Sequence, residues 1–265
     1  MSTIPVYTAK ELVNKVFPKP QWLIEPLLQR GGDWLLAGDP DAFKSLFLVQ
    51  MCIHASLGLD YLFLKMLPEP LRILYINVDD NPRLVQKRLR SLTPKGQTLN
   101  DNFMLVCQPG IKFDQAGQEL VKSWVIDYTP DIVIFDHLTE LVPGGTSDHR
   151  GMQDYNNLQK WICSQDIGVP SIAHLNRTSK DNEHASLLRM IGGCNSIISN
   201  HSVITGHISQ EKNIQFKHDR FEMHMLRNKN KEEKVEGEKH MIEVVRIDMD
   251  VETDDPWVRT FLREI

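Results

Sequence analysis

The sequence has few cysteines, and their spacing excludes the usual cysteine-based sites. Its 265 residues contain four cysteines and no CxxC pair, and the ten histidines form no HExxH arrangement. Dispersed cysteines without such a pair argue against a zinc cluster and against a disulfide framework. The four cysteines are Cys52, Cys107, Cys163 and Cys194. We therefore expect reduced thiols in or near a core, and no transition metal.

Long apolar runs are also missing. No stretch approaches the roughly 20 apolar residues that a membrane-spanning helix needs. Residues 1–20 contain no apolar segment followed by a cleavage site, so they do not resemble a secretory signal. The sequence thus predicts a protein without membrane segments, located in a bacterial or host cytoplasm.

A strong charge of one sign is absent as well. The formal net charge is −5 and the isoelectric point is about 6.1, so the chain as a whole does not attract phosphate polymers. Any contact with a nucleic acid would have to come from local basic loops.

The sequence does contain alternating apolar and amphipathic segments. This alternation is typical of an α/β fold, in which helices cover a mostly parallel sheet. The predicted strands are residues 34–37, 73–78, 103–107, 132–135, 170–173 and 203–208. The predicted helices are residues 44–57, 82–92, 115–128 and 151–165.

The chain length favours one main domain with two additions. We expect a leader at residues 1–20, which contains a short helix within 8–17, and a core at 21–210. Residues 211–265 are predicted to extend the same domain as an antiparallel hairpin, with strands at 220–226 and 241–251. A charged loop at 227–239 joins these two strands.

The segment between the first core strand and its helix matches a phosphate-binding loop. The pattern GxxxxGK[ST] is met at Gly38, Lys44 and Ser45, except at its second glycine. In such a loop, N–H groups at the helix N-terminus surround phosphates, the lysine reaches the outer phosphate and the hydroxyl holds Mg²⁺. We therefore predict an ATP site with Mg²⁺ at Ser45. Its residues are Gly38, Asp39, Pro40, Asp41, Ala42, Phe43, Lys44, Ser45 and Leu46.

Three residues of this loop depart from the usual chemistry. Phe43 replaces the second glycine, and we expect it to begin the helix with a negative φ, where a side chain is tolerated. Asp39 and Asp41 must turn toward solvent, because carboxylates repel phosphates. On this motif alone, a turn capped by Lys-Ser is an open alternative.

Polar side chains follow three further predicted strands. Asp136 ends the strand at 132–135, where a carboxylate can bind Mg²⁺ through water beside the loop. Asp79 follows the strand at 73–78 and is predicted to orient the attacking water from a strand next to the loop, while Asp80 caps the helix at 82–92. His174 ends the strand at 170–173 and is predicted to sense the outer phosphate, with a structural histidine as the alternative.

These motifs, in this order, resemble the RecA-like ATPases of the plasmid RepA type, which are relatives of the DnaB replicative helicases. The resemblance covers roughly residues 20–210 and rests on residues 22–32, 73–82, 131–136, 174–179 and 188–193. It implies catalytic roles for Lys44, Asp79 and His174 and Mg²⁺ ligation by Ser45 and Asp136. It also implies a homo-oligomeric ring, usually hexameric, with ATP between subunits, single-stranded DNA in the channel and replication partners on other chains.

The resemblance also points to two loops that would contact DNA. They lie at residues 143–156 and 176–193, and ordinary surface loops are an equally weighted alternative because few basic residues give only modest phosphate attraction. The predicted DNA-binding residues are Arg150, Arg177, Lys180 and Arg189.

Three departures from the family bear on hydrolysis. Phe43 replaces the glycine, Asp79 stands where the family has a longer glutamate, and His201 stands where it has an arginine that reaches the neighbouring nucleotide. Our leading hypothesis is an ATP-dependent, DNA-associated motor or loader from a plasmid, phage or similar replicon, which acts as a ring. The alternatives are a nucleotide-binding switch or assembly subunit that hydrolyses poorly, and an unrelated parallel-sheet protein with a chance loop.

Overall fold

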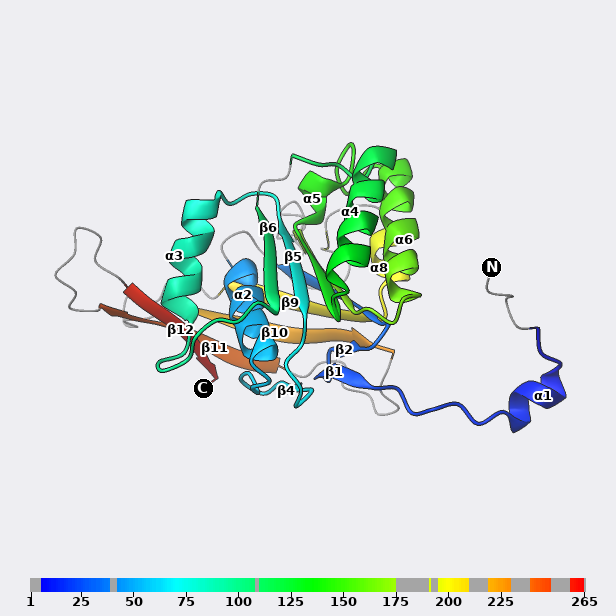
Figure 1. Ribbon diagram of the computed structural model, residues 1–265, viewed down its shortest axis with the longest axis horizontal. Helices are drawn as coiled ribbons and strands as arrows, with labels where there is room; N and C mark the ends of the chain where they lie inside the picture. Colours follow the sequence, from blue (N-terminus) through cyan, green and yellow to red (C-terminus); the bar gives the residue numbers. More distant parts are fainter. Residues whose placement is uncertain are drawn as a thin grey trace, which may run out of the picture.

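A computed structural model describes most of the chain, as residues 6–38, 42–107, 110–174, 191, 195–209, 219–229, 239–248 and 258–264. These residues form a nine-stranded sheet with helices on both faces and a small three-stranded sheet beside it (Figure 1). The α/β fold predicted from the sequence is confirmed.

The large sheet has a parallel part and an antiparallel part. In order across the sheet, the strands are β12 (Val258–Glu264), β11 (Lys239–Asp248), β10 (Asp219–Asn228), β9 (Val203–Ser209), β3 (Asp33–Gly38), β8 (Val169–His174), β7 (Ile132–Asp136), β5 (Ile73–Asn77) and β6 (Phe103–Cys107). The pairs from β9 to β6 are parallel, whereas β9 to β12 pair antiparallel. The carboxyl ends of six strands therefore share one edge.

Alternating side chains of each parallel strand face opposite layers of helices. Leu36 packs in one apolar cluster with Phe47 of α2, whereas its neighbour Leu35 packs in a second cluster with Val121 of α4 and Leu158 of α6. Near-continuous apolar strands are required because both faces of a parallel sheet are buried. The helices are α1 (Ala9–Asn14), α2 (Lys44–Ser56), α3 (Pro82–Leu92), α4 (Gln115–Tyr128), α5 (Leu138–Leu141), α6 (His149–Cys163) and α8 (Asn195–Asn200).

The leader stands apart from the rest of the molecule. Helix α1 begins with a capping box formed by Thr8 and Glu11, and none of its residues is buried. Figure 1 shows it extending away from the sheets on an extended segment. That segment contains Pro18 and Pro20, which stiffen it and exclude helix. The helix, Ala9–Asn14, lies within the predicted range of 8–17.

The sequence predicted most of the main elements and missed four strands. The strand at 103–107 and the helices at 82–92 and 115–128 have the predicted bounds, and the other predicted core elements differ by a few residues at most. The missed strands are β12 and the three strands of the small sheet, which are β2 (Leu28–Gln29), β1 (Trp22–Glu25) and β4 (Lys65–Met66) in order across that sheet. Strands of two to four residues carry too little periodicity to be recognised.

Two further observations concern the described residues alone. Cys52, Cys107 and Cys163 are free thiols, while Cys194 lies outside the described residues. Within the described ranges, no helix is long and apolar enough to cross a membrane.

Candidate functional site

The polar residues predicted from separate segments meet at the carboxyl edge of the parallel strands. Gly38 at the end of β3 is in register with His174 of β8 and with His207 of β9. Asp136 at the end of β7 is in register with Asn77 at the end of β5. This edge of an open α/β sheet is where such folds bind ligands.

Gly38 lies too close to β9 to carry a side chain. A Cβ atom at this position would lie 2.7 Å from the carbonyl oxygen of His207 and 2.9 Å from its Cβ. The His207 ring is itself buried, with Nδ1 3.3 Å from the carbonyl oxygen of Ala42 and the ring packed edge-on against Phe47 at 5.0 Å. A close approach of backbones therefore explains this glycine.

Lys44 begins α2 and points back toward the end of β3. Its side chain is buried, and its Nζ donates a hydrogen bond of 3.1 Å to the carbonyl oxygen of Gly38. The first N–H groups of a helix have no partner within it. An amine beside a helix N-terminus is an arrangement suited to bind phosphate.

Phe43 does not adopt the backbone conformation that we expected. It is the N-cap of α2 with φ 55° and ψ 24°, in the left-handed region rather than at a negative φ. Glycine reaches this region without steric penalty, which explains the glycine of the usual motif, whereas other residues lose roughly 1–3 kcal/mol there. The Phe43 side chain packs against the apolar cluster on the α2 face of the sheet, and this packing offsets part of the strain.

Asp136 is buried and receives hydrogen bonds from two hydroxyls. The Tyr75 hydroxyl donates to Oδ2 at 2.6 Å, and Ser45, one residue after Lys44, also bonds to this carboxylate. Burial raises the pKa of Asp136 above its ordinary value, and the two hydrogen bonds oppose that shift. A hydroxyl and a carboxylate oxygen are the hard ligands that Mg²⁺ takes together with phosphate and water. These residues therefore fit the predicted cation.

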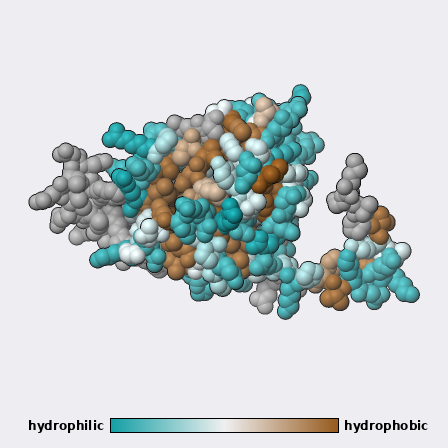
Figure 2. Space-filling view, in the orientation of Figure 1, coloured by the Kyte–Doolittle hydropathy of each residue, from teal (hydrophilic) through white to brown (hydrophobic). Residues whose placement is uncertain are grey.

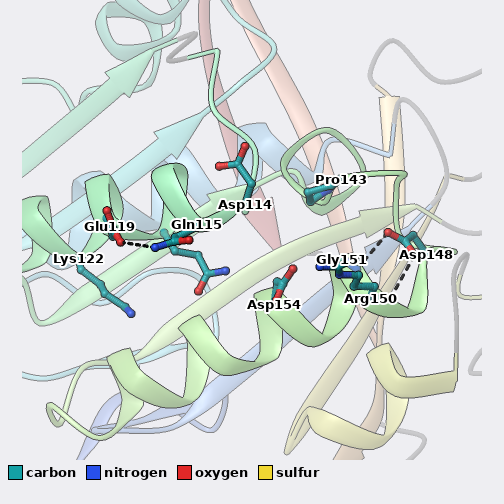
Figure 3. Close-up of a pocket in the computed structure, with 10 residues that line it drawn as sticks. Asp114, Gln115, Glu119, Lys122, Pro143, Asp148, Arg150, Gly151 and Asp154 are labelled. Atoms are coloured by element: carbon teal, nitrogen blue, oxygen red, sulfur yellow. Dashed lines mark hydrogen bonds between the residues drawn. The ribbon is translucent and has the colours of Figure 1, made fainter.

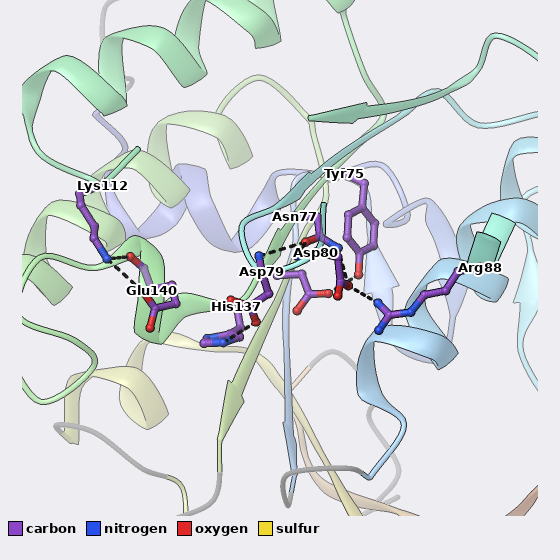
Figure 4. Close-up of polar contacts among 9 residues, drawn as sticks. Tyr75, Asn77, Asp79, Asp80, Arg88, Lys112, His137 and Glu140 are labelled. Carbon is purple, nitrogen blue, oxygen red and sulfur yellow. Dashed lines mark hydrogen bonds and ion pairs between the residues drawn. The ribbon is translucent and has the colours of Figure 1, made fainter. Parts of the chain in front are cut away.

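Asp79 and its neighbours form a second polar group at the same edge (Figure 4). Asp79 is half exposed, and its Oδ2 lies 2.9 Å from Nε2 of His137. The His137 ring meets the ring of His174 edge-on, with 4.6 Å between centroids. Strand β5, which ends two residues before Asp79, is separated from β3 by β8 and β7. The expectation that Asp79 follows a strand next to the loop strand is therefore wrong.

The expected role of Asp80 is also wrong. Asn81 caps α3, and its side-chain oxygen accepts from the backbone N–H of Leu84 at 3.0 Å. Asp80 instead forms an ion pair with Arg88 and accepts a hydrogen bond of 3.2 Å from Nδ2 of Asn77 (Figure 4). Asn81 immediately precedes the proline that begins the helix, so its position was the better signal for the cap.

The comparisons with known proteins concern the family and the fold. A family model described as an AAA domain matches residues 5–180, which is more than half of the chain. The chain belongs to the AAA domain family.

The solved structures give the same fold. This AAA domain chain is similar to a KaiC-like protein from the hyperthermophilic archaeon Pyrococcus horikoshii, with a TM-score of 0.58 and 12% sequence identity. The match covers 84% of this chain and 90% of that one. The fold is therefore RecA-like. No curated protein matches the sequence.

Several predicted residues of this AAA domain stay predictions. Ala42 is buried, and Leu46 of α2 is partly buried against the core. The residues Asp39, Pro40, Asp41, Arg177, Lys180 and Arg189 lie outside the described residues. Contacts of the loop with phosphate and of the second basic loop with DNA are therefore expectations from the sequence.

His201, predicted to replace an arginine that reaches a neighbouring subunit, is a core residue in this AAA domain. It is fully buried, with Nδ1 2.6 Å from the carbonyl oxygen of Ile197 and Nε2 3.2 Å from the Tyr155 hydroxyl. Its side chain therefore does not face the surface of the described chain.

Arg150 lines a cavity of about 670 Å³ between the first turns of α4 and α6 (Figure 3). The carboxylates of Asp114, Glu119 and Asp154 line the same cavity. Figure 3 shows Asp148 beside Arg150 at the start of α6, where it accepts hydrogen bonds from the first N–H groups of that helix. These carboxylates reduce the attraction of Arg150 for phosphate, and its contact with DNA stays a prediction.

Sequence reasoning missed Tyr75 and His137. Tyr75 lies in a buried, mostly apolar strand, and nothing in a single sequence indicates that its hydroxyl reaches Asp136. His137 directly follows Asp136 in the chain, so its position at the strand end was a usable signal.

Proposed function

We propose that this AAA domain chain binds ATP with Mg²⁺ at the carboxyl ends of β3 and β7 and hydrolyses it. The observation that carries the proposal is the hydrogen bond between Ser45, in the first turn of α2, and the buried Asp136 at the end of β7. It joins the predicted phosphate loop to the predicted cation ligand, although 91 positions separate the two residues (136 minus 45) in the sequence.

Each residue has a distinct task in this proposal. The Lys44 amine leaves the Gly38 carbonyl and binds the outer phosphate, while Ser45 and Asp136 hold the cation. Bound Mg²⁺ supplies positive charge that stabilises the developing charge on the phosphate oxygens. Asp79 orients the attacking water and accepts its proton. His174, beside Gly38 in the register of β3 and β8, responds to loss of the outer phosphate.

We further propose that the chain acts as a homo-oligomeric ring, most simply a hexamer. Support comes from the leader, since α1 buries none of its residues. Val13 and Val16 of the leader are 85% and 92% exposed, and apolar groups presented on a stiff arm favour docking on a second copy of the chain. The family resemblance supports ATP bound between subunits of such a ring.

In this proposal the ring is a helicase-like motor that holds single-stranded DNA and works in the cytoplasm with replication partners. Support comes from the resemblance and from the basic residues Arg150, Arg177, Lys180 and Arg189. The net charge of −5 means that this contact must be local and salt-sensitive.

The test measures phosphate release by the full chain with and without single-stranded DNA, together with its native mass. We expect Mg²⁺-dependent turnover that rises with DNA, from an assembly of several chains. Lys44→Ala should abolish stabilisation by ATP, because the outer phosphate loses its positive partner. A Lys44→Ala chain that binds ATP as well as the wild type would contradict the nucleotide site.

One alternative function is favoured by two features. Asp79 is one methylene shorter than glutamate, and His201 is buried in the core of the described chain. Both features favour a nucleotide-binding switch or assembly subunit that hydrolyses ATP poorly. In that case ATP would raise the melting temperature and the native mass without releasing phosphate.

A further inference from the structure

His137 follows β7 and contacts residues at the ends of two other strands, Asp79 after β5 and His174 of β8. It directly follows β7 and precedes α5, where its carbonyl oxygen accepts a hydrogen bond from the backbone N–H of Leu141. Its side chain is 12% exposed, whereas that of Asp79 is 50% exposed. The histidine is thus the fixed member of the pair, and the aspartate is the member that reaches solvent.

Two contacts determine where the His137 ring lies. Nε2 is 2.9 Å from Oδ2 of Asp79, and the ring packs edge-on against His174 with an interplanar angle of 71°. Its other nitrogen, Nδ1, is buried and has no hydrogen-bond partner among the described residues. The polar edge of the ring is therefore directed at Asp79, as Figure 4 shows.

Asp79 depends on accurate placement because its side chain is short. A half-exposed aspartate samples several rotamers in solvent, and each rotamer moves the carboxylate relative to the site. Aspartate is also about 1.5 Å shorter than glutamate, and misplacement of a reacting group on the 1 Å scale lowers rates by up to about 100-fold. The backbone of Asp79 is already fixed, since its N–H donates to Oδ1 of Asn77 at 3.1 Å. The side chain of Asp79 is in turn contacted by Nε2 of His137.

We propose that His137 is a positioning residue that holds the Asp79 carboxylate at the strand edge where water attacks the outer phosphate. The proposal rests on the proposed function, in which Asp79 orients that water. His137 acts through Asp79 and does not contact the nucleotide. Its contact with His174 places the carboxylate next to the strand that responds to the phosphate.

The test compares four full-length proteins in a double-mutant cycle: the wild type, His137→Ala, Asp79→Glu and the double variant. We expect His137→Ala to lower kcat by about tenfold while the KM for ATP stays within about twofold, because only transition-state orientation is lost. In the Asp79→Glu background the same change should cost about threefold or less. The longer side chain reaches the water without the tether.

Two further variants serve as controls. His137→Gln keeps a side-chain N–H donor and should recover part of the lost kcat. Lys112→Ala breaks the exposed contacts of Lys112 with Glu140 nearby without touching Asp79, and it should leave kcat unchanged. Circular dichroism and thermal unfolding of each variant identify any variant that fails to fold.

The outcomes separate this proposal from the proposed function. Wild-type kcat in His137→Ala, or an equal loss in both backgrounds, would overturn the positioning role while turnover by the wild type stands. Turnover that survives Asp79→Asn would remove Asp79 from catalysis and the role of His137 with it. A folded wild type that releases no phosphate would defeat both the hydrolysis claim and this inference.

Discussion

Two carboxylates end adjacent strands of the sheet, and their surroundings differ sharply. Asp136 on β7 is 4% exposed and accepts hydrogen bonds from Tyr75 and Ser45. Asp79, just beyond β5, is 50% exposed and is held by His137. A buried carboxylate surrounded by hydroxyls is suited to a cation, and an exposed carboxylate is suited to contact water. The two environments thus suit the same type of side chain to different tasks.

The largest effect that separates the two carboxylates should come from Asp136→Asn. The amide cannot supply the anionic oxygen that Mg²⁺ prefers, so we expect turnover to fall by about 1,000-fold or more, comparable with other losses of transition-state charge stabilisation. Stabilisation by Mg²⁺ and ATP together should disappear in thermal unfolding. A variant that keeps its response to Mg²⁺ would show that the cation binds elsewhere.

Asp79→Asn should have a smaller effect of a different kind. We expect kcat to fall by about 100-fold, in the range of a lost general base, with the affinity for ATP unchanged. Steady-state kinetics together with nucleotide titration of the folded variant separate the two quantities. Equal losses of affinity in the Asp79 and Asp136 variants would contradict the division of tasks.

Tyr75→Phe should lower the stability of the fold through the surroundings of Asp136, without changing those of Asp79. Removing the hydroxyl leaves a buried carboxylate oxygen without the donor at 2.6 Å, which costs about 1–3 kcal/mol of unfolding free energy. Chemical denaturation without Mg²⁺ measures this loss. Tyr7→Phe, at an exposed tyrosine of the leader, is the matched control and should leave the unfolding free energy unchanged.

The smallest predicted effect is on the pH dependence of stability without metal. The pKa of Asp136 is raised above 3.8, mainly by burial, so the folded chain binds this proton more tightly than the unfolded chain. Its stabilising contribution is therefore complete below the ordinary pKa of 3.8 and is lost as the pH rises through the folded-state pKa.

The measurement compares wild type with Asp136→Asn in a chelator from pH 4 to 8. Asp136→Asn lacks this titration, so its melting temperature relative to that of the wild type should rise with pH. The expected rise is about 2–4 °C for each kcal/mol of stability that the wild type loses. A difference that is constant across this range would mean that burial does not perturb Asp136.

Much of this site followed from local patterns. Gly38, Lys44 and Asp136 were predicted because short sequence motifs end apolar strands or begin a helix, and the carboxyl ends of parallel strands share an edge. Phe43 was assigned the wrong φ because the sequence does not reveal whether a residue caps a helix or lies within it. Asp80 was wrongly predicted to cap α3, because three consecutive polar residues precede Pro82 and each is a residue type that caps helices.

The sequence by itself determined the α/β class, the main strands and helices, and which carboxylates end the strands, because periodicity and motif spacing are local properties. Only the tertiary structure decided the strand order, which separates β3 from β5 by two strands. It also decided the partners Tyr75 for Asp136 and His137 for Asp79. Pairings between strands and contacts between their side chains depend on how the chain crosses from one strand to the next, and a single sequence does not encode those crossings in any one segment.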